Sequence, residues 1–421
     1  MTQNRPSSYL MSLTIIGILF FIFGFVTWIN GTLIPYLKIA CELQTDFQSY
    51  LVATAFFIAY TVMAIPSSYV LKKTGYKKGM SLGLFVMAAG AILFVPAAEA
   101  RNFDMFLVGL FIIGGGMALL QTASNPYVTI IGPIESAAMR ISIVGICNKV
   151  AGILAGLIFG YIALNNVDAL EASLNSMDAV SKNAALDELA GRVVGPYMII
   201  AGVLVFFGIA ILFSSLPEID DSVESEGSAA ANVNKTSVFQ FPHLILGAVA
   251  IFLYVGVEVL AGDTIISYGK SLGIELSTAR YFTQATLAFM LIGYIVGIVA
   301  IPKYMSQSTA LKICTWLGVI FTLGAVVTNG YVSVAFIALL GLANSLMWPA
   351  IFPLAIDGLG KFTKIASAIL IMSIAGGAIL PLIYGQLSEI FNSKDAYLMM
   401  LPCYLYIMYF AIKGHKVGRA I

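Results

Sequence analysis

Long apolar runs dominate the chain, and short polar stretches separate them. A helix needs roughly 20 apolar residues to cross the hydrocarbon core of a bilayer, which is about 30 Å thick. None of the runs alternates between apolar and polar positions, as the strands of a membrane β-barrel would. The pattern predicts an all-α integral membrane protein with twelve transmembrane helices, at 12–37, 47–71, 79–98, 104–131, 139–164, 194–215, 243–269, 279–302, 309–328, 331–356, 365–388 and 396–413.

Composition supports a membrane protein and argues against other classes. Of the 421 residues, 60% are hydrophobic and 10% are charged, against about 25% charged in an average soluble protein. The net charge of +1 gives no basic surface for nucleic acid. The four cysteines lie far apart and there are two histidines, so no metal cluster, disulfide framework or cofactor is predicted. No nucleophile–base set is visible either, and we do not expect an enzyme.

Two polar interruptions organise the apolar runs. Residues 165–192 predict a loop with room for a surface helix, between the fifth and sixth spans. Residues 217–240 are rich in Ser, Ala and acidic residues, which is typical of a flexible linker. We therefore predict an N-terminal six-helix half at 1–216, a cytoplasmic linker at 217–240 and a C-terminal six-helix half at 241–421.

The two halves resemble each other in sequence. Residues 30–38 read NGTLIPYLK and residues 262–270 read GDTIISYGK, which share Thr, Tyr and Lys at one register. A second echo pairs 64–66 with 300–302, at equivalent ends of the second and eighth spans. Two six-helix halves with a site between them, near the middle of the membrane, are the architecture of major facilitator transporters.

The distribution of Lys and Arg predicts the orientation. An even number of spans places both termini on one side, and 14 of the 22 basic residues fall on that side, seven on the other and one inside a span. Because cytoplasmic loops collect basic residues, both termini are predicted to be cytoplasmic. We expect a multi-pass protein of the bacterial inner membrane that functions as a monomer in the lipid bilayer.

Three sequence stretches make the resemblance specific. They are 24–31 with 33–35 (GFVTWING, LIP), 120–129 (LQTASNPYVT) and 132–136 (GPIES). These stretches resemble the fucose:proton symporter family of the major facilitators. The stretch 254–258 (YVGVE) is similar to the glucose/galactose branch of that family. The resemblance implies cation-driven uptake of a monosaccharide, with glucose or galactose favoured.

Two departures from the family pattern concern the coupling ion. The resemblance implies a carboxylate directly after Asn30 and a glutamate in the fourth span, where this chain has Gly31 and Gln121. Both groups that carry protons in the family are therefore neutral here. In the repeat register Gly31 corresponds to Asp263, so a carboxylate occupies the equivalent place in the other half.

Three charged residues lie deep inside predicted spans: Lys149 in the fifth, and Glu258 and Asp263 in the seventh. A buried charge costs about 3 kcal/mol or more without a partner, so these residues invite a functional interpretation. The alternative is a structural pair between Lys149 and Glu258 that fixes the packing of two helices. If the residues are functional, Glu258 binds either sugar hydroxyls or Lys149.

Asp263 is the predicted cation ligand, with sodium favoured over a proton. Gly262 would let the helix unwind and free backbone carbonyls, and Thr264 would add a hydroxyl oxygen, the kind of ligand that hard cations prefer. Asn30 joins this cation-coupling set, with a helix–helix hydrogen bond as its alternative role. No other ion or cofactor is expected.

The predicted sugar site combines amides with aromatic rings. Amide groups both donate and accept hydrogen bonds, and an indole offers a flat surface to the apolar face of a pyranose. Residues four apart share a helix face, which relates Gln121 to Asn125 and Asn344 to Trp348. The predicted sugar-binding residues are Trp28, Gln121, Asn125, Asn148, Lys149, Glu258, Asn344 and Trp348. For the tryptophans, core packing is an equally good explanation.

The sequence thus favours sodium-coupled symport of a monosaccharide such as glucose or galactose by alternating access. The alternatives are a proton-coupled symporter of fucose, mannose or N-acetylglucosamine, and a sugar facilitator without a coupling ion.

Overall fold

The computed structural model describes residues 6–131, 136–174, 176–214 and 235–418. Within these ranges the chain is helical and has no strand, as the hydropathy pattern predicts. Most of the predicted linker, and residues 132–135 of the third family stretch, lie outside the described residues.

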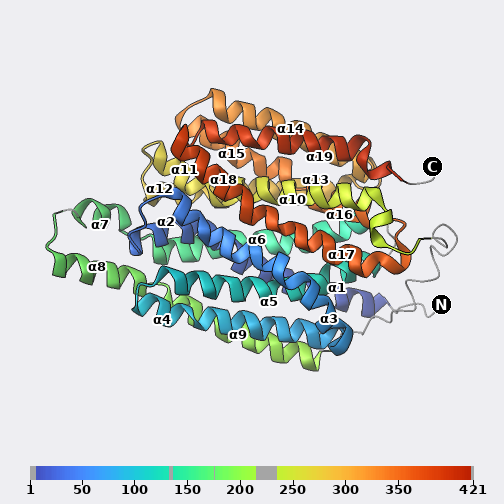
Figure 1. The fold of residues 1–421 in the computed structure, drawn as a ribbon, viewed down its shortest axis with the longest axis horizontal. Helices are drawn as coiled ribbons and strands as arrows, with labels where there is room; N and C mark the ends of the chain where they lie inside the picture. The colour runs from blue at the N-terminus through green and yellow to red at the C-terminus, as the bar shows by residue number, and fades with distance from the viewer. Residues whose placement is uncertain (1–5, 132–135, 175, 215–234, 419–421) are drawn as a thin grey trace.

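The first half of the chain supplies the helices that are coloured blue to green in Figure 1. They are α1 (Pro6–Trp28), α2 (Asn30–Ala40), α3 (Asp46–Ile92), α4 (Phe94–Glu99), α5 (Phe103–Ile130), α6 (Ala137–Ala163), α7 (Val167–Leu174), α8 (Ala179–Gly191) and α9 (Val194–Phe213).

The second half supplies the helices that are coloured yellow-green to red. The α-helices are α10 (Pro242–Asp263), α11 (Ile265–Ser271), α12 (Leu276–Ala279), α13 (Phe282–Ala300), α14 (Gln307–Val327), α15 (Gly330–Asn344), α16 (Met347–Ile356), α17 (Thr363–Met372), α18 (Gly376–Ile390) and α19 (Met400–Ile412). Short 3-10 helices are η3 (Val238–Gln240), η4 (Gly360–Phe362), η5 (Ser373–Ala375), η6 (Asp395–Met399) and η7 (Gly414–Lys416).

Eleven helical segments among the described residues are long and apolar enough to cross a membrane. One of them, Asp46–Glu99, has 54 residues and would extend roughly 80 Å if it were straight, more than twice the bilayer core. At Gly75 its backbone leaves the helical region, with φ 76° and ψ 174°. This segment therefore holds the second and third predicted spans, and the twelve predicted spans are all accounted for.

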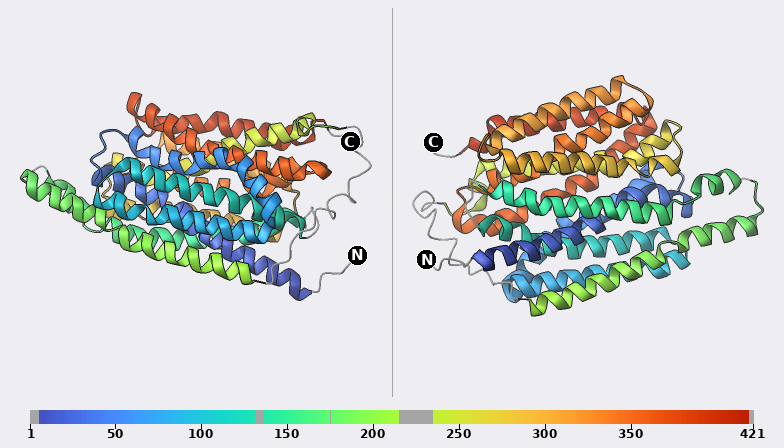
Figure 2. Two further views of the ribbon diagram at one scale, coloured as in Figure 1. Left: turned by 60° about the horizontal axis from the view of Figure 1, so that its bottom comes forward. Right: turned by 180° about the vertical axis from the view of Figure 1, so that it is seen from behind.

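The helices run along the long axis of the molecule, with the first half on one side and the second half on the other (Figure 1). The start of α1 and η7 lie at the same end, while α7 and α8 extend from the opposite end (Figure 2). These two helices form from the polar segment 165–192. The exact division of the chain into halves at 217–240 stays a prediction.

Several spans are divided into two helices. The first span is split into α1 and α2 at Ile29, and the seventh into α10 and α11 at Thr264. Pro35 lies inside α2 and has no N–H to bond the carbonyl of Gly31, four residues earlier. The tenth span breaks between Asn344 and Met347. Such breaks expose backbone groups where a transporter needs them.

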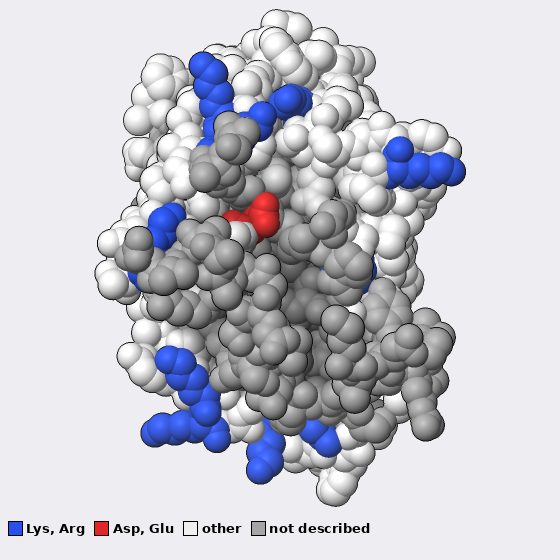
Figure 3. Space-filling model, turned by 90° about the vertical axis from the view of Figure 1, so that its right-hand side faces the viewer, with Lys and Arg blue, Asp and Glu red and all other residues white. Residues whose placement is uncertain are grey.

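The end of the molecule that carries α1 and η7 is rich in basic residues. Figure 3 shows Lys and Arg side chains around the rim of the described part of this face, with acidic groups visible near its centre. This arrangement agrees with the side to which the sequence assigns most Lys and Arg.

Candidate functional site: a polar cavity between the two halves

A cavity of about 110 Å³ lies between helices from both halves of the chain. A single water needs about 10–15 Å³ on this scale, so the cavity has room for a polar ligand with several hydrogen-bonding groups. Its walls come from α1, α3, α5 and α6 on one side and α10, α13, α16 and η5 on the other. The lining residues are Phe20, Phe23, Thr27, Trp28, Phe57, Tyr60, Gln121, Asn125, Ile141, Gly145, Asn148, Lys149, Tyr254, Val255, Glu258, Val259, Asp263, Tyr294, Trp348 and Ile374.

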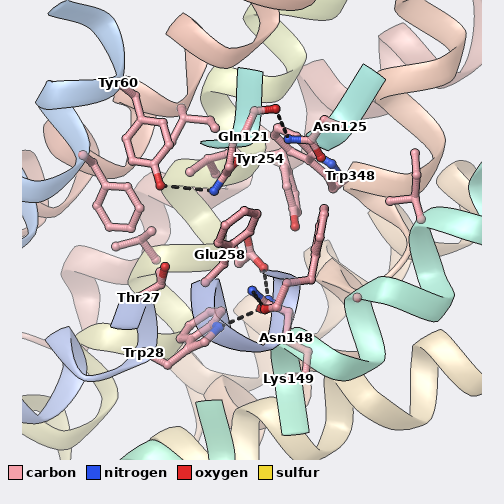
Figure 4. Close-up of a pocket in the computed structure, with 18 of the residues that line it drawn as sticks. Thr27, Trp28, Tyr60, Gln121, Asn125, Asn148, Lys149, Tyr254, Glu258 and Trp348 are labelled. Atoms are coloured by element: carbon pink, nitrogen blue, oxygen red, sulfur yellow. Dashed lines mark hydrogen bonds and ion pairs between the residues drawn. The ribbon is translucent and has the colours of Figure 1, made fainter. Parts of the chain in front are cut away.

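Lys149 and Glu258 form an ion pair inside this cavity (Figure 4), with 3.0 Å between Nζ and Oε1. Lys149 comes from α6 and Glu258 from α10, so the pair joins the two halves. The Lys149 ammonium also lies 4.2 Å from the centre of the Trp28 ring, within the range of a cation–π contact. The Lys149–Glu258 pair, which the sequence offered as a structural alternative to a functional role, is therefore present. Both of its residues line the cavity.

Trp28 is held in place by polar and steric contacts. Its indole N–H donates to the side-chain oxygen of Asn148 at 3.1 Å. A Cβ atom added to Gly152 or to Gly262 would lie within 2.5 Å of the Trp28 ring. The ring therefore occupies the space that two glycines leave, one on α6 and the other on α10, and contacts both halves of the molecule.

Gln121 and Asn125 lie on one face of α5, as their spacing predicts, and both line the cavity. The Gln121 amide donates to the hydroxyl of Tyr60 at 3.1 Å. The Asn125 amide donates to the backbone carbonyl of Gln121 at 3.1 Å. These bonds orient the two amides, and Figure 4 shows the labelled side chains around a common space.

The structure separates Asn344 from Trp348. Because the tenth span breaks between α15 and α16, the two residues do not belong to one continuous helix, and the shared face that their spacing predicts does not form. Trp348 lines the cavity beside Tyr254, with ring centres 6.4 Å apart. Asn344 is fully buried outside it and accepts a hydrogen bond from the Tyr404 hydroxyl at 2.9 Å.

Asp263 lines the cavity, and its side chain is nearly inaccessible, with 2% of the residue exposed. Its Oδ1 atom is buried and has no hydrogen-bond partner. A buried polar atom without a partner is rare in native proteins and calls for an explanation. Glu258 and Asp263 both line the cavity. No helix break at Gly262 is needed for this, since α10 is helical through Gly262 to Asp263.

The other predicted cation ligands are arranged differently from the sequence-based expectation. The Thr264 hydroxyl is buried outside the cavity lining, 2.6 Å from the Leu260 carbonyl and 2.6 Å from the Tyr397 hydroxyl. Asn30 is also buried outside the lining. The helix breaks after Asp263 instead of unwinding at Gly262, whose carbonyl accepts a hydrogen bond from Thr283 at 2.7 Å.

Sequence reasoning missed several residues of the cavity wall. Tyr254 precedes Glu258 by four residues and shares its helix face, a signal that was available. Thr27 adjoins Trp28. The sequence does not single out Tyr60 and Tyr294, because a tyrosine in an apolar span cannot be distinguished by sequence from an aromatic residue that only packs against other helices. Only the packing of α3 and α13 against the cavity identifies them.

The comparisons with known proteins agree with this architecture. Residues 16–381 match the Major Facilitator Superfamily. The chain belongs to this superfamily. It is 34% identical over 416 residues to a glucose/galactose transporter of Brucella abortus biovar 1 (strain 9-941), a match that covers 98% of this chain and 96% of the relative.

Two further comparisons connect the chain to fucose symporters. It is 31% identical over 416 residues to the L-fucose-proton symporter of Escherichia coli (strain K12), covering 97% of this chain and 94% of the relative. The crystal structure of the major facilitator FucP in its outward conformation superposes with a TM-score of 0.77 at 28% identity, covering 98% of this chain and all of FucP. This chain is therefore a multi-pass membrane transporter, and an enzymatic function is not indicated.

Proposed function

We propose that this major facilitator carries a monosaccharide into the cell together with a cation. The observation that supports the proposal best is the cavity between the halves, where aromatic rings, oriented amides and an ion pair surround a space that also contains Asp263. Glucose or galactose is the favoured sugar, since relatives across nearly the whole chain are named as glucose/galactose transporters. Fucose, mannose and N-acetylglucosamine are the alternatives.

The aromatic rings, the amides and Glu258 in the cavity can each bind a different part of a neutral sugar. The rings of Trp28 and Trp348 offer apolar surfaces to the C–H face of a pyranose. Gln121 and Asn125 can donate to and accept from its hydroxyls. Glu258, which pairs with Lys149 through Oε1, can also accept from a hydroxyl.

Asp263 is the proposed cation-coupling carboxylate. The deep charges of the cavity are one lysine and two carboxylates, so one added cation would balance them. An unpaired carboxylate at this depth is costly, and cation binding would remove that cost. Once the cation has balanced the charge of the cavity, the two halves can close over the sugar and reopen on the other side of the membrane, which is alternating access.

Two observations favour different ions. Neutral residues at Gly31 and Gln121 favour sodium, because both positions that the family resemblance associates with protons lack a titratable group. The Thr264 hydroxyl favours a proton. Sodium needs several oxygen ligands, but this oxygen already forms hydrogen bonds with Leu260 and Tyr397. Sodium is the ion that the sequence favours, and Asp263 would then be its ligand from α10, because the Thr264 hydroxyl is engaged and Asn30 lies outside the cavity lining.

The test is equilibrium binding of D-glucose, D-galactose and L-fucose to the purified protein. Affinity is measured against sodium concentration at fixed pH, and then against pH without sodium, in the wild type and in Asp263→Asn. For sodium coupling we expect the sugar affinity to rise with sodium in the wild type and to lose this response in Asp263→Asn. By linkage, the sugar should tighten sodium binding by the same factor.

Other outcomes discriminate among the alternatives. A response to pH without a response to sodium would indicate proton coupling. No response to either ion would indicate a facilitator, and a full sodium response in Asp263→Asn would remove Asp263 from the mechanism.

The relatives of this chain are bacterial transporters. We therefore propose that the chain lies in the inner membrane. We further propose that it functions as a monomer with both termini in the cytoplasm. The basic end in Figure 3 would then face the cytoplasm, and α7 and α8 would face outward.

A further inference from the structure

The broken helices of the first and seventh spans meet at their breaks. A Cβ atom added to Gly31, at the start of α2, would lie 3.4 Å from the Cα atom of Asp263. It would also lie 3.3 Å from the carbonyl oxygen of Gly262. The internal repeat pairs Gly31 with Asp263. Equivalent positions of the two halves therefore face each other across the interface.

Both of the helices that meet here, α2 and α10, carry buried polar atoms without hydrogen-bond partners. Asp263 Oδ1 is buried without a hydrogen bond, and so are Nδ2 of Asn30 and Oγ1 of Thr32, the two neighbours of Gly31 in sequence. All three residues are at most 2% exposed. Since buried polar atoms in native proteins almost always have a partner, an ion or a water, the unpartnered carboxylate oxygen of Asp263 marks a place where a cation would bind. The amide nitrogen of Asn30 is a hydrogen-bond donor and would not be a ligand.

We propose that positions 31 and 263 face one shared cation site, which a single carboxylate can serve from either half of the molecule. The inference rests on the proposed function, in which Asp263 couples the cation. In this chain the C-terminal half supplies the carboxylate, and Gly31, which has no side chain, lets α2 approach the backbone of α10 closely. The place of the site is set by the meeting of the two helix breaks rather than by which half carries the acid.

Charge and space both limit the site to one carboxylate. With Lys149, Glu258 and Asp263, one bound cation balances the cavity, whereas a second carboxylate at position 31 would add an unbalanced negative charge at low dielectric. Space at position 31 is tight. A Cβ atom there would lie 3.0 Å from Oγ1 of Thr283 and 3.3 Å from the Gly262 carbonyl oxygen, so an acid at this position requires its neighbours to shift by a few tenths of an ångström.

The decisive experiment moves the carboxylate from one half to the other. The exchange variant is Gly31→Asp with Asp263→Asn, and its matched control is Gly31→Asn with Asp263→Asn, which has nearly the same shape without the charge. Sugar affinity of each purified variant is measured with and without the coupling ion identified for the wild type. We expect Asp263→Asn to lose the ion-dependent gain in affinity, the exchange variant to regain most of it, and the control to regain none.

The outcomes separate this inference from the proposed function. If Asp263→Asn loses ion coupling and the exchange variant binds sugar equally well without regaining it, the shared site is overturned while coupling through Asp263 stands. If the control regains coupling as well, a carboxylate at position 31 is not what matters, and the inference is also overturned. A wild type without any ion response overturns the coupling proposal and this inference with it.

A second measurement does not depend on transport or on folding of the exchange variant. The close approach at Gly31 places the two Cα atoms about 5 Å apart or closer, within the range of a disulfide. In a variant whose native cysteines are replaced, Gly31→Cys with Asp263→Cys should crosslink on mild oxidation and separate on reduction. Gly31→Cys paired with Val259→Cys, one turn away on α10, is the control. Failure of the first pair to crosslink overturns the juxtaposition.

Discussion

Lys149 is the cation that connects the aromatic and acidic parts of the cavity. Its ammonium contacts Glu258 at 3.0 Å and the Trp28 ring at 4.2 Å, and only 5% of the residue is exposed. In such a setting the desolvation cost of the two charges can equal their attraction. The ion pair therefore fixes the geometry of the site more than it stabilises the fold.

We predict that breaking this pair costs more than removing it. Lys149→Ala leaves Glu258 buried without its partner, which should lower the free energy of unfolding by about 3–5 kcal/mol. Lys149→Ala combined with Glu258→Gln should be less destabilised than Lys149→Ala alone. Thermal unfolding in detergent checks this. If the double variant shows the sum of the two single effects, the residues do not act as a pair.

The amides on α5 lead to a second prediction. Gln121→Ala and Asn125→Ala should each weaken sugar binding by about 1–3 kcal/mol, because hydrogen-bonding groups of the sugar or the site lose their partners. Asn344→Ala is the control, because this buried amide lies outside the cavity. Equilibrium binding should show a loss for the two α5 variants and none for the control. Equal losses in all three would place the sugar elsewhere.

At the scale of elements, α7 connects the two halves at the end of the molecule away from the termini. The Asp168 carboxylate accepts hydrogen bonds from the backbone N–H groups of Leu276 and Ser277, each at 2.9 Å. Glu171, one turn further along α7, binds Lys270 through both oxygens at 2.7 Å. These contacts cross from the first half to the second, so they hold this end closed in the present conformation.

We therefore predict that Asp168→Asn with Glu171→Gln opens this end more often. The measurement is the rate at which a thiol reagent, added from the α7 side, labels a cysteine introduced at Val255 in the cavity wall. Labelling should become several-fold faster, since charge-assisted bonds of about 1.5–3 kcal/mol are lost. Asp46→Asn, which breaks an ion pair with Lys38 inside one half, is the control and should not change the rate. An unchanged rate in both variants would remove α7 from the closure.

At the scale of the whole molecule, the orientation in the membrane can be tested directly. The positive-inside distribution predicts that α8 is outside the cell and that the α3 bend near Gly75 is inside. Asn183→Cys and Lys78→Cys, in a variant without native cysteines, should therefore differ in intact cells. A membrane-impermeant thiol reagent should label the first but not the second. The reverse pattern would invert the topology.

The sequence determined a large part of this molecule on its own. The span count follows from apolar run length, because a bilayer requires a minimum helix length. The three deep charges, Lys149, Glu258 and Asp263, were identifiable because charges inside spans are costly. The match of Gly31 with Asp263 followed from the internal repeat. These features depend on local composition and spacing, which any single sequence displays.

Only the tertiary structure decided which side chains share the cavity. Helical spacing placed Asn344 with Trp348, but a break in the tenth span separates them, and such a break depends on packing between helices. Thr264 was assigned to a cation by its position, yet Tyr397, distant in sequence, lies beside its hydroxyl. Tyr60 and Tyr294 reach the cavity from helices whose faces the sequence leaves ambiguous. The physical reason is common to all: in an apolar span, periodicity does not reveal which face meets protein and which meets lipid.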